Sequence, residues 1–428
     1  MRSYQIPYGR KVLTFELPDA AETREIRARA SRPVENAAVA IRRAVENPIG
    51  TPPLSRLVHP GEKVVIVVSD ITRLWVRSDI LVPVLVAMLN EAGIPDDDIS
   101  IVFATGDHRR QTPEEHALIL GEDLTKRVAL FDHDCFASDL VDLGVSTRGT
   151  PILVNRRVFQ ADRVIVTGGI AYHLLAGFGG GRKSIAPGVC GYKTIQGNHS
   201  LALKDAGASG VNPAVGTGKL SGNPVNEDML EISRKVGVDF IVNVVVNEKS
   251  EYLRVLAGEL NEAHLAGCRV VEDIFGIEID NQADLVIASC GGYPKDISHY
   301  QSIKALDNAA HAVKDGGVII LAAECADGVG SEPFWKFFRH TEVSEMQAAL
   351  QANFTMPEFI ALWAASICRR SPVILISSLE EDTVRSLRMI PAHNEVEAVN
   401  LAGELLGREP ESVYIMPHAG NTFPILRC

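Results

Sequence analysis

Eight short runs rich in β-branched residues recur along the chain, and patterns typical of helices fill the gaps between them. Nearly every residue in these runs is apolar, as in strands that are buried on both faces. The sequence therefore predicts an α/β fold with mostly parallel sheets flanked by helices. The runs are KVVIVVSD (63–70), ISIVFATG (99–106), DRVIVTGG (162–169), DFIVNVVVN (239–247), ADLVIASCGG (283–292), GGVIILAAEC (316–325), SPVILISSL (371–379) and SVYIMP (412–417).

The domain organisation follows from the length and from the spacing of these runs. A chain of 428 residues is too long for one ordinary hydrophobic core. We expect two α/β domains, residues 1–270 and 283–400, with the active site in the cleft between them. The segment CRVVEDIFGIEIDNQ (268–282) connects the domains, and the C-terminal segment 410–428 can pack back onto the first one.

Composition excludes several classes of partner. The formal net charge of −12 argues against non-specific binding to nucleic acid or to anionic lipid, so we expect no nucleic-acid and no membrane partner. The N-terminus lacks the apolar stretch of a signal peptide, and Pro83 interrupts the longest strongly apolar run. The seven cysteines are scattered and never spaced as C-x-x-C, which favours a reducing cytoplasm and excludes a disulfide framework or a zinc ribbon.

Polar residues follow three of the predicted strands directly. Residues 70–73 follow the first run, 106–110 the second and 168–173 the third. Ligands bind at this edge of an open α/β sheet, so we expect a pocket there. The sequence TPEE (112–115) next to it reads as a helix capping box, with Thr112 as the cap.

The segment GFGGGRKSIAPGVCGYKTIQGNHS (177–200) is dense in glycine and carries several cations. It is not a P-loop, because Arg182 separates the glycines from Lys183, and Pro187 prevents a long helix from starting where a P-loop needs one. Arg182 also stands where a dinucleotide fingerprint needs its third glycine. Backbone N–H groups of closely spaced glycines can approach an anion, so the segment predicts a bound anion or cofactor rather than a plain surface loop.

The other polar clusters each have a structural and a functional interpretation. Asp70 and Arg73 in SDITR (69–73) can form a salt bridge, or Arg73 can clamp a carboxylate or phosphate. His108 suits acid–base chemistry but also fits a polar turn, and His173 fits a buried structural site. A fourth cluster follows a later strand and comprises Tyr300, Gln301 and Lys304, with Tyr300 and Lys304 one helical turn apart.

Taken together, these motifs closely resemble the signature of the nickel-dependent lactate racemase family. That family combines the glycine-rich segment with an S-D-x-T-R turn, a G-x-H-R turn, a preceding histidine and a G-G-Y-P…Y-Q-x-x-K segment. The same order occurs in this chain, and the resemblance runs from IPYG near the N-terminus almost to the C-terminus. The matching segments are SDITR (69–73), GDHR (106–109), YHLLAGF (172–178) and GGYPKDISHYQSIK (291–304).

The resemblance implies a nickel-pincer nucleotide, which is pyridinium-3,5-bisthiocarboxylic acid mononucleotide carrying nickel. Motif position implies that Lys183 tethers one arm as a thioamide and that His199 is the nickel ligand from the protein. Imidazole suits Ni(II) in roughly planar coordination. Enzymes of cofactor biosynthesis are then implied partners for loading. The remaining residues expected at the cofactor are Asp70, Gly179, Gly180, Gly181, Arg182 and Ser184, with Arg182 near the nucleotide phosphate.

The implied activity is racemisation or epimerisation of a small 2-hydroxy carboxylic acid, with lactate as the default substrate. The α-hydrogen of such an acid is barely acidic beside a carboxylate, so reversible hydride transfer to the cofactor is the easier route. The hydroxyl group lies on a different side in each enantiomer, and His108 and His173 match the family's pair of acid–base groups. The residues expected to bind the substrate are Arg73, Tyr300, Gln301 and Lys304.

Two features leave the substrate open. The family's lactate enzymes can carry a pocket tryptophan after a proline like Pro357, whereas Trp363 stands about a turn later here. Arg110 adds a cation beside Arg109, which is either a surface arginine or a ligand for a second carboxylate, as in malate. Two other classes of function are a carrier of the cofactor without turnover, which has no use for the histidine pair, and a phosphotransferase, which the broken P-loop pattern disfavours.

Overall fold

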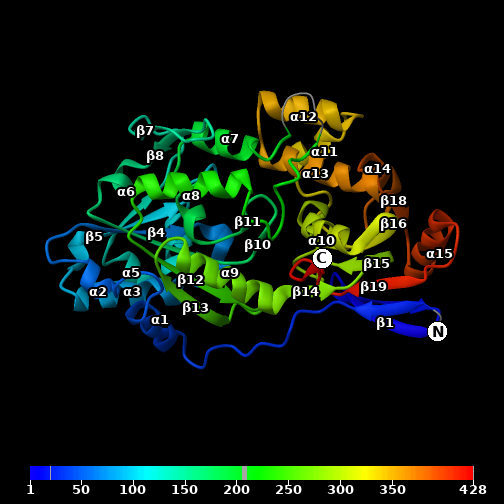
Figure 1. The fold of residues 1–428 in the computed structure, drawn as a ribbon, viewed down its shortest axis with the longest axis horizontal. Helices are drawn as coiled ribbons and strands as arrows, with labels where there is room; N and C mark the ends of the chain where they lie inside the picture. The colour runs from blue at the N-terminus through cyan, green and yellow to red at the C-terminus, as the bar shows by residue number, and fades with distance from the viewer. Residues whose placement is uncertain (20, 205–209, 428) are drawn as a thin grey trace. The chain divides into compact units, whose positions relative to one another are not determined.

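The computed structural model describes residues 1–19, 21–204 and 210–427 (Figure 1). The chain divides into two compact units. The terminal unit consists of Met1–Ala30, Leu203–Pro213 and Glu272–Cys428, and the central unit of Ser31–Ala202 and Ala214–Val271. The central unit is thus inserted into the terminal unit along the sequence.

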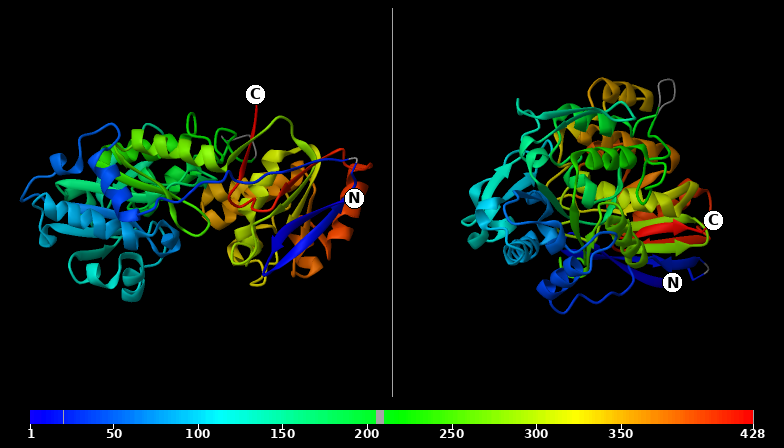
Figure 2. Two further views of the ribbon diagram at one scale, coloured as in Figure 1. Left: turned by 90° about the horizontal axis from the view of Figure 1, so that it is seen from below. Right: turned by 60° about the vertical axis from the view of Figure 1, so that its left-hand side comes forward.

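The central unit is built on a six-stranded sheet with the strand order β13-β12-β9-β4-β5-β6. All neighbouring strands are parallel except β12 and β13. Helices lie on both sides of the sheet, with α8 on one side and α1 and α3 on the other (Figures 1 and 2). The strands are β4 (Val64–Ser69), β5 (Ile99–Ala104), β6 (Ala129–Asp132), β9 (Arg163–Gly169), β12 (Phe240–Val246) and β13 (Tyr252–Gly258).

The other elements of the central unit connect and cover these strands. Its α-helices are α1 (Ala37–Glu46), α2 (Leu54–Leu57), α3 (Ser78–Glu91), α4 (Pro113–Leu120), α5 (Glu122–Thr125), α6 (Arg156–Gln160), α7 (Tyr192–Ser200), α8 (Pro224–Val236) and α9 (Glu262–Phe275), which continues into the terminal unit. Two hairpins and three 3₁₀ turns complete it: β7 (Val141–Val145) with β8 (Pro151–Val154), β10 (Tyr172–His173) with β11 (Gly177–Phe178), η1 (Ile71–Val76), η2 (Asp96–Asp98) and η3 (Gly181–Ser184).

Local sequence explains the start of α4 and the buried face of α3, the two helices next to the site. The predicted capping box is present at α4, where Thr112 accepts from the Glu115 backbone and the Glu115 side chain accepts from the Thr112 backbone. Helix α3 buries Leu81, Leu85 and Leu89, spaced as helical periodicity requires, against the sheet. Helices α3 and α4 are the first α-helices after β4 and β5, respectively.

The terminal unit holds the second six-stranded sheet, with the order β18-β17-β16-β15-β19-β3 and parallel pairing throughout. The strands are β3 (Glu22–Glu25), β15 (Ala283–Ser289), β16 (Val313–Ala322), β17 (Val373–Ile376), β18 (Ile390–Ala392) and β19 (Ser412–Met416). The other elements are the pairs β1 (Arg2–Tyr8) with β2 (Lys11–Leu17) and β14 (Gly276–Ile279) with β20 (Phe423–Leu426), and the helices α10 (His299–Ala312), α11 (Glu332–Phe337), α12 (Val343–Ala352), α13 (Met356–Arg370), α14 (Glu381–Ser386) and α15 (Glu395–Leu406).

The α/β architecture with mostly parallel sheets is confirmed, but the chain is divided differently from the expected 1–270 and 283–400. The first thirty residues belong to the terminal unit, because β3 pairs with β19 as the edge strand of its sheet. Residues 412–416 form β19, which lies between β15 and β3 in this sheet. Segment 410–428 therefore belongs to the terminal unit and not to the unit that holds the glycine-rich segment. Within the described part of the chain, no helix has both the length and the apolar character needed to cross a membrane.

Candidate active site

The candidate site lies at the carboxyl ends of three neighbouring strands of the central sheet. From β4 the chain proceeds to β5 and β6 on one side, whereas β9 and β12 lie on the other side of β4. The boundary between β4 and β9 is therefore a topological switch point, the place where open α/β sheets bind ligands. Asp70 and Arg73 follow β4, His108 follows β5, and His173 and the glycine-rich segment follow β9.

The glycine-rich segment is fixed to the sheet by two hydrogen bonds. The Ser184 hydroxyl donates to the carbonyl oxygen of Thr167 in β9 at 2.8 Å, and the Gly181 N–H donates to Asn243 Oδ1 in β12 at 2.9 Å. Gly180 and Gly181 have φ values of +78° and +50°, which only glycine adopts readily. A Cβ on Gly180 would lie 2.9 Å from Asn243 Oδ1, so the absence of a side chain allows the backbone to approach the sheet.

The Arg182 side chain points into the protein rather than toward a ligand. It is 2% exposed, donates to Asn226 Oδ1 at 2.6 Å and to the Ala176 carbonyl at 3.0 Å, and its Nη1 lies 2.7 Å from His264 Nε2. These partners are uncharged, and burial lowers the pKa of Arg182 to about 10. The expected contact between Arg182 and a nucleotide phosphate is therefore not retained, because the guanidinium already donates to protein groups.

Lys183, the next residue, has a different environment. Its Nζ lies 2.9 Å from His173 Nε2, and the side chain is partly buried. Burial, followed by the charges of Arg73 and Arg182, lowers the pKa of Lys183 to about 7. A large fraction of this amine is thus uncharged near neutral pH, which is the form that reacts as a nucleophile.

His173 lies in β10 and is held from both sides of its ring. Its Nδ1 accepts from the backbone N–H groups of Leu175 and Ala176 at 3.1 and 3.2 Å. Its Nε2 is the atom near Lys183. The structure therefore brings together two residues, His173 and Lys183, that the resemblance assigned to different tasks.

His199 lies in the last turn of α7 and is 6% exposed. Burial, followed by the charge of Lys183, lowers the pKa of His199 to about 3. The imidazole is therefore neutral at physiological pH, as a metal ligand must be. A neutral buried imidazole and a neutral lysine amine both fit the predicted cofactor, since one can bind nickel and the other can be acylated.

His108 is paired with a carboxylate. Its Nδ1 lies 2.5 Å from Asp70 Oδ2, and this hydrogen bond, against the effect of burial, raises the pKa of His108. Burial alone would raise the pKa of Asp70, but the hydrogen bonds from His108 and Thr72 outweigh it and leave that pKa lowered. Asp70, which we expected at the cofactor, is thus hydrogen-bonded to the Nδ1 side of the His108 ring.

The arginines near His108 differ in their partners. Arg73 is exposed and donates through Nη1 to the Thr72 hydroxyl at 3.0 Å. Arg109 forms a two-fold hydrogen-bonded ion pair with Glu115, and Arg110 pairs with Asp134 at 3.0 Å. Arg110 and Asp134 also line a cavity of about 330 Å³ with Arg156 and Arg157.

The remaining predicted substrate residues belong to the terminal unit. Tyr300, Gln301 and Lys304 lie in the first two turns of α10, and the Tyr300 ring packs edge-on against Phe334 at 5.5 Å. Trp363 in α13 is buried and donates from Nε1 to Asp307 Oδ1 at 2.9 Å. Trp363 therefore joins α13 to α10 within the terminal unit.

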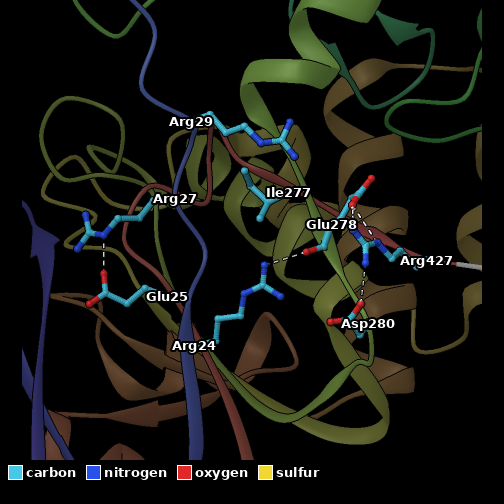
Figure 3. A pocket seen from close by; sticks show the side chains of 8 residues that line it. All are labelled: Arg24, Glu25, Arg27, Arg29, Ile277, Glu278, Asp280 and Arg427. Carbon is cyan, nitrogen blue, oxygen red and sulfur yellow. Dashed lines mark hydrogen bonds and ion pairs between the residues drawn. The ribbon is translucent and has the colours of Figure 1, made fainter.

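A further cavity in the terminal unit contains none of the predicted residues. It measures about 430 Å³ and is lined by side chains near β3, β14 and β20. Figure 3 shows acceptors for three of its arginines: Arg24 donates to the Glu278 carbonyl, Arg27 pairs with Glu25, and Arg427 pairs with Glu278 and Asp280. Arg29 donates to the Asp273 carbonyl. The lining residues are Arg24, Glu25, Arg27, Arg29, Ile277, Glu278, Asp280 and Arg427.

Sequence reasoning missed the residues that support the glycine-rich segment. Asn243 fixes Gly181, and Asn226 and His264 surround Arg182. One signal was available: Asn243 is the single polar residue in the strand FIVNVVV, where a buried polar group needs a partner. For Asn226 and His264, which lie in ordinary helical patterns, the sequence carried no such signal.

Comparison with known proteins agrees across the whole chain. Residues 8–210 match the family described as lactate racemase N-terminal domain, and residues 279–421 match the lactate racemase C-terminal domain. The lactate racemase of Thermoanaerobacterium thermosaccharolyticum is 35% identical over 422 residues, covering 96% of each chain. The lactate racemase of Lactiplantibacillus plantarum is 31% identical and covers 94% of this chain and 95% of its own.

Solved structures give the same result. The lactate racemase apoprotein from Thermoanaerobacterium thermosaccharolyticum superposes with a TM-score of 0.88 at 33% identity, over 99% of this chain and 100% of that one. A Thermotoga maritima protein solved by structural genomics superposes with a TM-score of 0.62 at 18% identity, over 93% of this chain and 100% of its own. The second likeness concerns the fold alone.

Proposed function

The chain belongs to the lactate racemase family, so the protein is an isomerase, and on that premise we propose that it interconverts the enantiomers of a 2-hydroxy carboxylic acid. Lactate is the first substrate to test, because both curated relatives are named lactate racemase. The observation that carries the proposal is that His108, His173 and Lys183 follow neighbouring strands at one switch point, with Lys183 near enough to His199 for its charge to lower the pKa of that ring.

We propose that the protein binds a nickel-pincer nucleotide, with Lys183 as the covalent tether and His199 as the nickel ligand. The uncharged states of both side chains support this assignment. When bound, this cofactor supplies the acceptor for the hydride of the substrate. Gly179, Gly180, Gly181 and Ser184 support the proposal by bringing the backbone next to Lys183 onto the end of β9.

His108 and His173 are the proposed acid–base pair for the substrate hydroxyl. His108 can exchange a proton through Nε2 while Asp70 receives the Nδ1–H, an arrangement that fixes the ring tautomer. Asp70 is accordingly proposed as a positioning residue for His108 rather than as a cofactor ligand.

Arg73 is proposed to bind the substrate carboxylate, because its guanidinium is exposed at the end of β4. Tyr300, Gln301 and Lys304 stay the predicted partners of the carboxylate from the terminal unit. Enzymes of cofactor biosynthesis stay the predicted partners for loading.

Single residues distinguish the proposed function from the two alternatives, malate recognition and a cofactor carrier. Recognition of a second carboxylate, as in malate, would need Arg110 to release Asp134. A cofactor carrier without turnover would need Lys183 and His199 only, and would have no use for a histidine held by a buried aspartate. The hydrogen-bonded pair of His108 and Asp70 therefore favours an enzyme.

The test combines mass and chirality. Full-length protein is produced with and without the cofactor biosynthesis enzymes, its intact mass is measured, and a chiral assay follows over a panel of 2-hydroxy acids that includes lactate and malate. We expect a mass increase on Lys183, absent in K183A, together with racemisation of at least one acid. A loaded protein without added mass on Lys183 would refute the tether, and a loaded, nickel-bearing protein inert on the whole panel would refute the racemase.

A further inference from the structure

The hydrogen bonds of His173 determine where its proton lies. Backbone N–H groups of Leu175 and Ala176 both point at Nδ1. A ring nitrogen that accepts from N–H groups carries no proton itself, so the neutral ring carries its proton on Nε2. The opposite tautomer would place an Nδ1–H against two backbone N–H groups.

The same geometry determines the state of Lys183. The Nε2–H of His173 points at Lys183 Nζ, which lies 2.9 Å away and must accept the hydrogen bond. An ammonium group has three N–H donors and no lone pair, so only the uncharged amine can accept. Burial of the side chain and the nearby charges of Arg73 and Arg182 favour the same uncharged state of the amine.

Tethering removes this acceptor. In the proposed loading, the Nζ–C bond would form with the thiocarboxylic acid of the cofactor, the C–O bond would break, and the oxygen would leave as water with one proton from the amine and one from the acid. The nitrogen lone pair of the resulting thioamide is delocalised, so this nitrogen is a donor only. It cannot accept the hydrogen bond from His173 Nε2–H.

We propose that His173 acts twice, an inference that rests on the proposed function. Before loading it is a positioning residue that holds Lys183 as an uncharged nucleophile, and after tethering has removed this acceptor its ring turns away from the backbone N–H groups and exchanges the proton of the substrate hydroxyl. The second step is required because in the observed arrangement Nδ1 cannot take up a proton and Nε2 already holds one. The ring must leave the N–H groups of Leu175 and Ala176 before it can act as a base.

The first test measures amine reactivity in the full-length protein made without the biosynthesis enzymes. Acetic anhydride is added in limiting amount at pH 7, and acetylation of Lys183 is compared with that of the exposed Lys193 by peptide mass mapping. We expect the Lys183 to Lys193 ratio to fall about fivefold to tenfold in H173L, which loses the donor. H173Q, which keeps an N–H donor, should retain at least half of the ratio.

The two possible proton arrangements predict opposite changes in the Lys183 to Lys193 acetylation ratio. If a Lys183 ammonium instead donates to a bare Nε2, the ratio rises in H173L, because removal of the acceptor favours the uncharged amine. An unchanged or raised ratio overturns the inference. H59Q, at an exposed histidine of the same unit, is the matched control and should leave the ratio unchanged.

A second measurement uses wild-type protein only, so it does not depend on whether a His173 variant folds. The ¹⁵N spectrum of histidine-labelled wild-type protein should show His173 with its proton on Nε2, and a proton on Nδ1 would overturn the inference. Both measurements use protein without cofactor, so they do not depend on turnover. Racemisation with an unchanged Lys183 ratio would remove this inference alone. A loaded but inert protein would remove the proposed function and with it the second role of His173, and would leave its effect on the Lys183 amine.

Discussion

The two histidines of the candidate site have opposite surroundings. His108, after β5, faces the buried carboxylate of Asp70, which raises the affinity of the ring for a proton. His173, after β9, faces two backbone N–H groups and the Lys183 amine, which fix its proton on one nitrogen. Two residues that the motifs assign to the same acid–base task therefore differ in how easily they can exchange a proton, because the hydrogen-bond partners of each ring determine which nitrogen carries it.

The largest expected effect tests whether both histidines take part in turnover. H108Q and H173Q should each lower kcat/KM of the loaded enzyme by about 10²–10⁴, the usual contribution of an acid–base group. Enantiomers have equal free energy, so kcat/KM must fall equally in both directions. The chiral assay is normalised to the loaded fraction from intact mass, so that a difference in loading between the two variants does not enter kcat/KM.

Unequal losses of activity in loaded H108Q and H173Q would show that the two histidines do not share the acid–base task. If H173Q, once loaded, kept more than half of the activity, the second acid–base role would be refuted. H59Q serves again as the control and should behave as wild type.

The second prediction concerns Asp70 alone. D70N removes the charge that raises the pKa of His108, so the pH midpoint at which His108 loses its proton should move down. We expect kcat to fall by about tenfold to a hundredfold at neutral pH, with loading on Lys183 unchanged. An identical pH profile in D70N would show that the carboxylate does not act through His108.

The pair should also affect stability in a defined pH window. The raised pKa of His108 contributes stability that is present below its usual value and lost as pH rises through the folded pKa, and the lowered pKa of Asp70 contributes stability lost as pH falls. The stability difference between wild type and D70N should therefore be largest between about pH 4 and pH 6.5. Urea unfolding across this range measures it, and a maximum at alkaline pH would contradict the assignment.

A smaller effect is expected where the glycine-rich segment meets the sheet. S184A removes the donor to the buried Thr167 carbonyl and should lower the free energy of unfolding by about 1 kcal/mol. Urea unfolding of the cofactor-free protein measures the difference. A stability equal to wild type would mean that the segment is held without this bond.

The smallest effect is expected at Arg110. This side chain is exposed and paired with Asp134, and exposed ion pairs contribute little. R110A should leave the ratio of malate to lactate activity unchanged in the chiral assay. A selective loss of malate activity would restore the hypothesis that Arg110 binds a second carboxylate.

The sequence was sufficient for the parts of the fold that depend on local pattern. Apolar runs located the inner strands of both large sheets and the Thr112 capping box was visible as four residues, whereas the short edge strands β3, β6 and β18 carried no such run. The pairing of β3 with β19 was not visible, because two short strands distant in sequence carry no signal of their partnership.

The candidate site shows the same limit. Motifs indicated which residues gather at the strand ends, but not which group each one contacts. Arg182 was placed at a phosphate because of its charge, although its fully buried side chain depends on Asn226 and His264, which lie far along the chain. Asp70 likewise needed three-dimensional geometry before it could be assigned to His108.

The insertion of the central unit into the terminal unit has a consequence for synthesis on the ribosome. Glu22 in β3 pairs with Ser412 in β19, so this sheet edge cannot form until nearly the whole chain has been translated. The central unit, continuous apart from one short excursion, can fold while synthesis continues. Strand β3 must meanwhile wait without its sheet partner, whereas β1 and β2 can already pair with each other. Residues 22–25 are therefore a segment that stays open to chaperones and proteases during synthesis.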